Sequence, residues 1–181
     1  MALLKIAKMG HPVLFERAQE VENPLDGDIQ ALIANMLDTL KDADGLGLAA
    51  PQVYASKRII VVAGLNAGHE PDDSEPLVLV NPVYDAVGDE LVRGIEGCLS
   101  IPGIRGIVPR YGQLNYSALD GNGKPVSGSA GGLVARIIQH EVDHLDGVLF
   151  PARLENPVDM AFDSERGYLK ERMSRGSKSH V

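Results

Sequence analysis

The chain has 181 residues, of which 44% are hydrophobic and 23% are charged, and this size and composition fit one globular domain with an adequate core. A formal net charge of -8 argues against a protein that coats nucleic acid, because phosphate binding needs clustered positive charge. A single cysteine excludes an intramolecular disulfide framework, and the sequence shows neither a secretory segment nor an apolar run of membrane length, so we expect a cytoplasmic protein with no membrane anchor.

The first part of the chain predicts an irregular arm followed by a helix. Residues 1–25 are rich in turn signals that contain glycine and proline. From Asp28 to about Ala43 apolar side chains recur at helical spacing, which predicts an amphipathic helix that serves as scaffold and ends near Gly45. Its apolar positions are Ile29, Leu32, Ile33, Met36, Leu37 and Leu40.

The next segment, residues 45–52, reads Gly-Leu-Gly-Leu-Ala-Ala-Pro-Gln. Small residues let another backbone approach closely, but these two glycines lack the spacing of a dinucleotide or phosphate loop. Two interpretations stay open at this point. The segment is either a tight turn between helix and strand, or a site where the side-chain amide of Gln52 donates a hydrogen bond to a developing oxyanion.

Apolar runs in the middle of the chain predict β-strands. Residues 58–62 are a β-branched run that we expect to be buried on both faces, and residues 77–82 are a second strand that Pro82 should stop. Residues 87–93 are a candidate third strand. Between the first two strands, residues 64–76 predict a solvated loop with an acidic cluster to which we assign no calcium site: Asp72, Asp73 and Glu75.

Further strands are predicted at residues 105–108 and 113–119. The sequence Asp-Gly-Asn-Gly at residues 120–123 is a strong hairpin signal. Small residues at 127–132 predict a loop that leads into a helix beginning near Leu133.

That helix carries Gln-His-Glu-Val-Asp-His at residues 139–144, a motif of the form His-Glu-x-x-His. Two imidazoles four residues apart lie on one helix face, where both can reach one ion at about 2.0–2.1 Å. Glu141, beside the first histidine, is placed to accept a proton from water at such an ion. Both histidines share a stripe with Leu133 and Ile137, so we expect them to point into the interior, and Gly147 to close the helix.

The single cysteine, Cys98, lies in a glycine-rich turn region. A lone cysteine is usually a buried small hydrophobe. Here the helix supplies only two protein ligands and a thiolate is a good ligand for borderline metals, so Cys98 is the leading candidate for a third. Glu96 is either a fourth ligand or the partner of Arg105 or Arg110, and we favour the ion pair.

The last part of the chain is less informative. Residues 148–150 form an apolar run that resembles a strand, and residues 155–181 are poor in apolar side chains and end in a basic stretch. Such tails are usually solvated. The alternative is a short helix near residues 164–173 that contacts an anionic partner.

Three blocks occur together in order: residues 45–52, residues 96–100 (Glu-Gly-Cys-Leu-Ser) and residues 139–147. In this conjunction the chain resembles peptide deformylase over roughly residues 3–153. The resemblance implies an α+β fold with antiparallel strands packed around a central helix that carries the His-Glu-x-x-His motif. It also implies that residues 1–181 are a single catalytic domain.

The resemblance further implies a role for each matching residue. Cys98, His140 and His144 would be the metal ligands, Glu141 the general acid and base, and Gln52 and the backbone N–H of Leu99 the oxyanion donors. The remaining candidates would bind the peptide: Gly45, Leu46, Gly47, Glu96, Gly97, Arg105 and Ile137.

The implied activity is removal of the N-formyl group from formylmethionine at the start of newly made polypeptides. The implied cofactor is one divalent ion, Fe(II) in the cell, with Zn(II), Ni(II) or Co(II) in purified protein. A further implied partner is the ribosome, through the basic tail. Two other classes share parts of the pattern: a zinc endopeptidase, which more often takes Glu or His as third ligand, and a non-catalytic metal-binding module.

Overall fold

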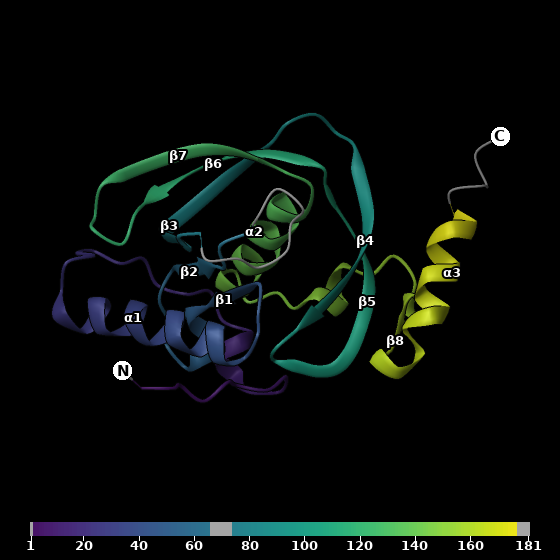
Figure 1. The fold of residues 1–181 in the computed structure, drawn as a ribbon, viewed down its shortest axis with the longest axis horizontal. Coiled ribbons are helices and arrows are strands. Elements are labelled where there is room, and N and C mark those ends of the chain that lie inside the picture. The colour runs from purple at the N-terminus through teal and green to yellow at the C-terminus, as the bar shows by residue number, and fades with distance from the viewer. Residues whose placement is uncertain (1, 66–73, 177–181) are drawn as a thin grey trace.

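In the residues described by this computed structural model, 2–65 and 74–176, the chain forms two antiparallel sheets and three α-helices (Figure 1). The five-stranded sheet has the order β1 (Gly47–Ala49), β2 (Ile59–Val62), β3 (Leu77–Ala86), β6 (Gln113–Leu119) and β7 (Pro125–Gly131). The three-stranded sheet has the order β4 (Leu91–Cys98), β5 (Ile101–Tyr111) and β8 (Met160–Phe162). The helices are α1 (Gly27–Asp42), α2 (Gly132–Leu145) and α3 (Arg166–Gly176). This mixture confirms the predicted α+β class.

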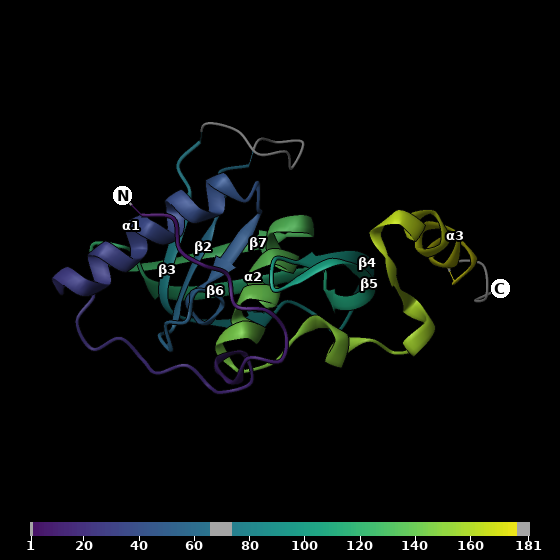
Figure 2. The ribbon, with the colours of Figure 1, turned by 90° about the horizontal axis from the view of Figure 1, so that it is seen from below.

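Strand β2 shows how the layers are fixed, because its four residues are all buried. Ile59 and Val61 pack in a cluster with α1, whereas Ile60 and Val62 pack with α2. Successive side chains of a strand point to opposite faces, so the sheet has one helix on each side. Figures 1 and 2 show α2 in the middle of the molecule, between the five-stranded sheet and the β4–β5 hairpin. The prediction of a strand buried on both faces is confirmed.

The predicted end of the strand at residues 77–82 was wrong. Strand β3 does not stop at Pro82 but continues to Ala86 through an irregularity between Val80 and Val83. A bulge removes residues from the hydrogen-bonded ladder, so a proline without an N–H is tolerated there. Asn81, at φ 53°, forms two hydrogen bonds of 2.9 Å with the backbone of Val21 and thereby holds the bulge.

The small residues 127–132 do not form a loop, because β7 pairs with β6 along its whole length. Gly128 explains the choice of small residues: the ring of Tyr116 occupies the space of a side chain there, with its Oη 2.7 Å from an ideal Cβ position. The hairpin turn predicted at residues 120–123 joins these two strands, with the N–H of Asp120 donating to the carbonyl of Lys124 at 2.8 Å. Gly128 therefore allows close packing against the neighbouring strand and does not indicate a turn.

The candidate strand at residues 87–93 begins later than predicted. Residues 87–89 form a bend, and β4 runs from Leu91 to Cys98, where a two-residue turn leads into β5. The predicted strand 105–108 is the middle of β5, which is longer than expected. The single cysteine is consequently the last residue of a strand, next to a tight hairpin turn.

The segment after α2 also differs from expectation. Residues 148–150 are not a strand: Phe150 begins a 3-10 helix that includes Pro151. Leu149 and Phe150 nevertheless pack into a core cluster with β5, so their apolar character reflects burial. Periodicity cannot separate a short buried strand from another buried segment.

The C-terminal helix predicted near residues 164–173 is α3, which begins at Arg166. A buried carboxylate, Asp159, accepts hydrogen bonds from Arg93 on β4 at 2.6 Å and from Arg172 on α3 at 2.7 Å. This pair of contacts fixes α3 against the three-stranded sheet. Most of the predicted loop 64–76, including Asp72 and Asp73, lies outside the described residues, as do residues 177–181. Within the described ranges, no helix is both long and apolar enough to cross a membrane.

Candidate metal centre

The helix α2 brings its two histidines into the interior. His140 and His144 are 8% and 1% exposed, and their ring centroids are 5.1 Å apart. The two residues are one helical turn apart, so both side chains leave α2 on the same face. As the stripe of apolar residues predicted, that face is turned toward the core and away from bulk water.

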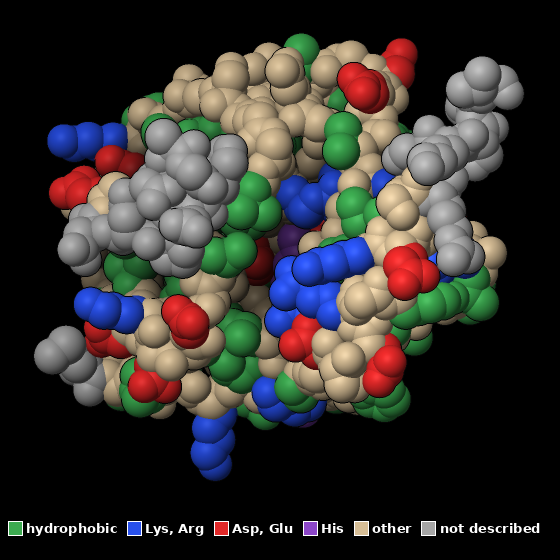
Figure 3. Space-filling view, turned by 45° about the vertical axis from the view of Figure 1, so that its right-hand side comes forward, with side chains coloured by type: hydrophobic (Ala, Val, Ile, Leu, Met, Phe, Trp, Pro, Cys, Tyr) green, Lys and Arg blue, Asp and Glu red, His purple; other side chains and the backbone are tan. Residues whose placement is uncertain are grey.

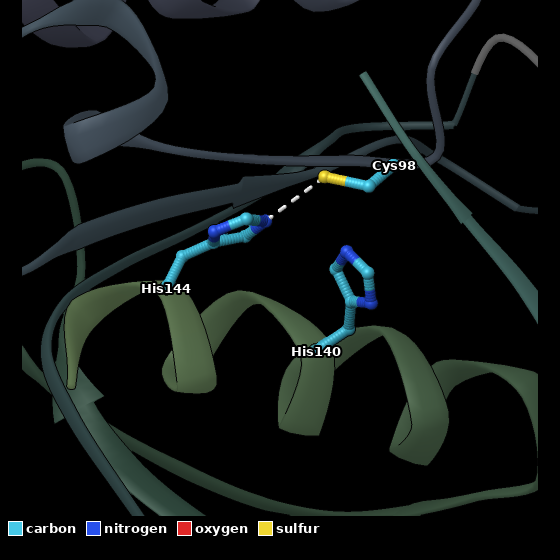
Figure 4. A group of neighbouring side chains, drawn as sticks. All are labelled: Cys98, His140 and His144. Carbon is cyan, nitrogen blue, oxygen red and sulfur yellow. Dashed lines mark hydrogen bonds between the residues drawn. The ribbon is translucent and has the colours of Figure 1, made fainter. Parts of the chain in front are cut away.

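Cys98, at the end of β4, reaches the same place from a different element (Figure 4). Its Sγ lies 3.2 Å from Nε2 of His144, and one potential ligand atom from each of Cys98, His140 and His144 lies within 4.8 Å of the others. Bonds of about 2.3 Å to sulfur and 2.0–2.1 Å to nitrogen are compatible with this spacing. One thiol and two imidazoles therefore converge where a single ion could be bound.

The chemistry of this donor set fits a catalytic metal ion. Three protein ligands leave one tetrahedral position for water or substrate, as in catalytic zinc sites. Burial keeps the pKa of His144 well below its usual value, so its imidazole is neutral and able to bind a metal. Burial opposes a charge on His140, but hydrogen bonds to Cys98 and Glu96 raise its pKa to about 10. The surroundings of His140 thus favour a positive charge, which a metal ion would supply in place of the proton.

Glu96 is committed to an ion-pair network. Its buried carboxylate accepts hydrogen bonds from Nδ1 of His140 at 2.8 Å, from both arms of Arg110 at 2.9 and 3.0 Å, and from Arg136 at 2.8 Å. Burial alone would raise the pKa of Glu96, but the hydrogen bonds from His140 and Arg110 lower it to about 2. The preferred interpretation as an ion pair is confirmed for Arg110. Arg105, the other suggested partner, pairs with Asp163 at 2.8 Å.

The network extends to the other end of the motif. Asp143, buried on α2, accepts hydrogen bonds from Arg110 and from both Nε and Nη2 of Arg153. Arg110 therefore bridges two buried carboxylates, one beside the metal-ligand candidates and one on the helix that carries them. A His ligand whose second nitrogen is hydrogen-bonded to a carboxylate has a fixed ring orientation. His140 has this arrangement.

Glu141 is 3% exposed, and its Oε2 has no hydrogen-bond partner among the described residues. Burial raises the pKa of Glu141 to about 7, partly opposed by the charge of His140. A carboxylate with a pKa near neutrality can both accept and return a proton at physiological pH. Gly47 is needed beside it, because an added Cβ would overlap the Glu141 carboxylate and lie 2.8 Å from Ile137.

Gln52 is positioned by its own segment. Its Oε1 accepts a hydrogen bond from the N–H of Ala49 at 2.8 Å, which turns Nε2 toward Sγ of Cys98 at 3.5 Å and Oγ of Ser100 at 3.3 Å. The segment 45–52 thus forms a short strand followed by the start of a 3-10 helix, in which Gln52 is buried, and its role as an oxyanion donor stays a prediction. Leu99 follows Cys98 in the hairpin turn.

These residues meet in one cleft with a volume of about 620 Å³, visible as a hollow in Figure 3. Its lining includes all the predicted site residues except His144, which lies deeper: Gly45, Leu46, Gly47, Gln52, Glu96, Gly97, Cys98, Leu99, Arg105, Ile137, His140 and Glu141. Strands β1, β4 and β5 line it, and β1 and β4 are edge strands of their sheets. Edge strands offer unpaired backbone groups with which an extended peptide can form an added strand.

Sequence reasoning missed three cationic lining residues. Arg136 lies one helical turn before His140, and this spacing could have indicated its role beside Glu96. Lys8 and Arg166 come from the two ends of the chain. No local pattern could place them at the cleft, because their positions depend on tertiary packing.

Comparison with known proteins agrees with this geometry. Residues 3–159 match the polypeptide deformylase family. The chain belongs to this family. It is 42% identical over 168 residues to peptide deformylase 1 of Prochlorococcus marinus strain MIT 9313, a match that covers 91% of this chain and 88% of the relative. It is 41% identical over 165 residues to peptide deformylase 2 of Nostoc sp. strain PCC 7120, covering 90% and 92%.

Solved structures of peptide deformylases have the same fold. A peptide deformylase from Synechococcus elongatus in complex with actinonin aligns with a TM-score of 0.77 at 39% identity, covering 95% of this chain and 85% of that one. A class I type b peptide deformylase from Acinetobacter baumannii with bound Met-Ala-Ser aligns with a TM-score of 0.78 at 39% identity, covering 84% and 99%. The chain is therefore a metal-dependent hydrolase that removes the N-formyl group from nascent polypeptides.

Proposed function

We propose that Cys98, His140 and His144 hold one divalent ion and that Glu141 and Gln52 complete the deformylase active site around it. The observation that supports this most directly is the convergence of one thiol and two imidazoles, from β4 and α2, in the cleft. A divalent ion at such a position supplies Lewis acidity, which in known cases lowers the pKa of water to about 7 and polarises a carbonyl.

The substrate peptide lies extended between the two edge strands. Its backbone pairs with the edges near Gly45, Gly47 and Gly97, which line the cleft. The methionine side chain occupies the apolar part of the cleft beside Leu46 and Ile137. In this pose the formyl group is next to Cys98 and Glu141.

Glu141 moves the protons. Its Oε2 accepts a proton as water attacks the formyl carbon, and the same oxygen returns the proton to the departing nitrogen. Gln52 Nε2 and the N–H of Leu99 donate hydrogen bonds to the formyl oxygen as negative charge develops there. One such donor is typically worth about 2.7–4 kcal/mol in the transition state. A C–O bond forms and the C–N bond breaks, which releases formate and a free N-terminus.

The proposed metal in the cell is Fe(II). Zn(II), Ni(II) or Co(II) would occupy the site in purified protein, because thiolate and imidazole ligands bind the later metals more tightly than Fe(II). A thiolate on iron is open to oxidation, so aerobic handling is expected to lower activity.

The experiment that tests this function combines two measurements on anaerobically purified protein. Metal analysis should find about one divalent ion per chain, and formyl-Met-Ala-Ser should release formate. The peptide bonds of formyl-Met-Ala-Ser should stay intact, and this result would distinguish a deformylase from an endopeptidase. A protein with bound metal but no formate release would contradict the proposal.

The remaining proposals concern the whole chain. We propose that residues 1–181 act as a single catalytic domain in the cytoplasm and that the C-terminal segment, 155–181, contacts the ribosome through its basic end. Lys170, exposed on α3, supports the last point. Cosedimentation with ribosomes should be weaker for Lys170→Glu than for the wild type, and equal binding would contradict the contact.

A further inference from the structure

One wall of the cleft carries an excess of positive charge. Lys8, Arg105 and Arg166 line it on the side of the β4–β5 hairpin, and Figure 3 shows lysine and arginine side chains gathered beside the hollow. Lys8 belongs to this side because its Nζ donates to the carbonyl of Leu99 at 3.0 Å. Beyond the residues of the metal centre, the acidic residue that lines the cleft is Asp44, which precedes β1 on the other wall.

These charges differ in how far they are neutralised. Arg136 also lines the cleft, but its guanidinium is bound to Glu96 and to two backbone carbonyls. Arg105 is paired with Asp163. Within the part of the chain that the structure describes, Lys8 is bound to a neutral carbonyl, and neither Lys8 nor Arg166 has an ion pair. Lys8 and Arg166 therefore retain positive charge that a bound ligand can meet.

The C-terminal segment holds Arg166 at this wall. Strand β8 adds to β5 with Arg105 opposite Ala161, and Asp163 then pairs with Arg105. Arg105 is itself opposite Gly97, and its guanidinium carbon lies 2.6 Å from where a Cβ of Gly97 would be. The guanidinium of Arg105 thus lies beside Gly97, the residue before Cys98 on the edge strand β4, while Lys8 lies at Leu99 on the other side of Cys98 and Arg166 lines the same cleft.

This position can be related to the substrate. An extended chain advances about 3.4 Å per residue, so a peptide whose formyl group is at Cys98 passes Gly97 with its first residue, and its second and third residues follow one and two steps farther along the cleft that these cations line. Backbone hydrogen bonds form equally well with any side chain at the second and third residues. Unpaired cations, in contrast, favour a negative side chain over a positive one. A negative side chain at those residues would meet Arg166 and Lys8, and a positive one would be repelled.

We propose that Arg166, together with Lys8 and Arg105, makes this deformylase prefer formyl-peptides with an acidic side chain at the second or third residue. The inference rests on the proposed placement of the peptide in the cleft. Residue 166 follows the last residue matched by the family, 159, so this determinant belongs to the C-terminal segment of this chain.

The test compares isosteric peptides with amidated C-termini, so that the terminal carboxylate does not contribute. The ratio of kcat/KM for Glu over Gln is measured at each position in formyl-Met-Glu-Ala-amide against formyl-Met-Gln-Ala-amide, and in formyl-Met-Ala-Glu-amide against formyl-Met-Ala-Gln-amide. In the wild type we expect a ratio of about two to five at one position or more, the size of an exposed ion pair. The ratio should approach one as salt is raised, because exposed charges are screened.

Arg166→Glu should invert this ratio and Arg166→Gln should bring it near one. The matched control is Arg17→Glu, which makes the same change of charge at an exposed residue outside the cleft lining and should keep the wild-type ratio. Ratios unchanged by both Arg166 variants would overturn the inference while formate release from the Gln peptides leaves the proposed function intact. Absence of formate release from every peptide would overturn both.

Discussion

Nδ1 of His140 donates to the carboxylate of Glu96 at 2.8 Å, and the same carboxylate is bound by two arginines. A histidine that ligates a metal through one nitrogen is oriented by the hydrogen bond at the other. Glu96 thus fixes the ring of His140 and favours positive charge at it, although Glu96 is not itself among the converging ligand atoms.

Glu96→Gln should therefore weaken metal binding by about 10- to 100-fold, the usual cost of losing such a partner. Competition with a chelator, using Co(II) or Zn(II) as the probe, measures the affinity. The control is Glu90→Gln, which removes an exposed carboxylate outside the network. Equal affinities for the two variants would show that Glu96 does not act on the metal site.

Glu141→Gln should retain the metal and the fold but lose turnover by about 10²- to 10⁴-fold, the usual contribution of a positioned acid or base. The amide has nearly the same size as the carboxylate but cannot take up the proton of the attacking water. Formate release and metal content are measured on the same preparation. Near-normal turnover would remove Glu141 from the mechanism.

Gly47→Ala should lower kcat/KM by about 100-fold, because the added methyl group displaces the carboxylate of Glu141 and a small misplacement of a catalytic group is costly. Gly27→Ala is the matched control, since an added Cβ at Gly27 meets no atom within 4 Å. Circular dichroism and the unfolding midpoint check that both variants fold. If both variants kept full activity, the close approach at Gly47 would have no catalytic importance.

Arg110→Ala should lower the free energy of unfolding by about 3–5 kcal/mol, because it leaves the buried carboxylates of Glu96 and Asp143 without their shared partner. Arg153→Ala removes a second partner of Asp143 whose side chain is 47% exposed, and we expect a loss of no more than about 1 kcal/mol. Urea unfolding of the two variants gives the comparison. Similar losses would contradict the central place of Arg110 in the network.

Asp120, in the β6–β7 hairpin, should make a contribution to the free energy of unfolding that depends on pH. The N–H of Lys124 and the N–H of Asn122 donate to its carboxylate and lower its pKa below the usual value. Since the folded pKa is below the unfolded one, the stabilisation is present at neutral pH and is lost as pH falls through the folded pKa. The difference in unfolding free energy between wild type and Asp120→Ala should shrink below about pH 4. For Asp89→Ala, at an exposed residue outside this hairpin, the difference should show no such trend.

The histidine pair could be predicted from sequence because its information is local: spacing on a helix sets which side chains share a face. The β2 run and the hairpin at residues 120–123 were predictable for the same reason. The passage of β3 through Pro82 was not, because it depends on hydrogen bonds between Asn81 and Val21, which are 60 residues apart. The predictions for Cys98 and for Glu96 with Arg110 rested on chemical complementarity between distant residues, and the structure places those residues together. The sequence offered no recognisable chemical partner for Arg166, so its position at the cleft could be found only from the tertiary structure.

The carboxylate of Asp159 couples the C-terminal helix α3 to strand β4 beside the cleft. Arg93 belongs to the strand that borders the cleft, Arg172 belongs to the terminal helix, and one acid binds both. A macromolecule that drew the helix away would release Arg172 from Asp159, leave Arg93 as its one remaining cationic partner among the described residues, and move Arg166 away from the proposed peptide site. If Arg166 selects acidic peptides as proposed, a partner that binds the helix would change that selection, and the peptide would in turn change the affinity for the partner.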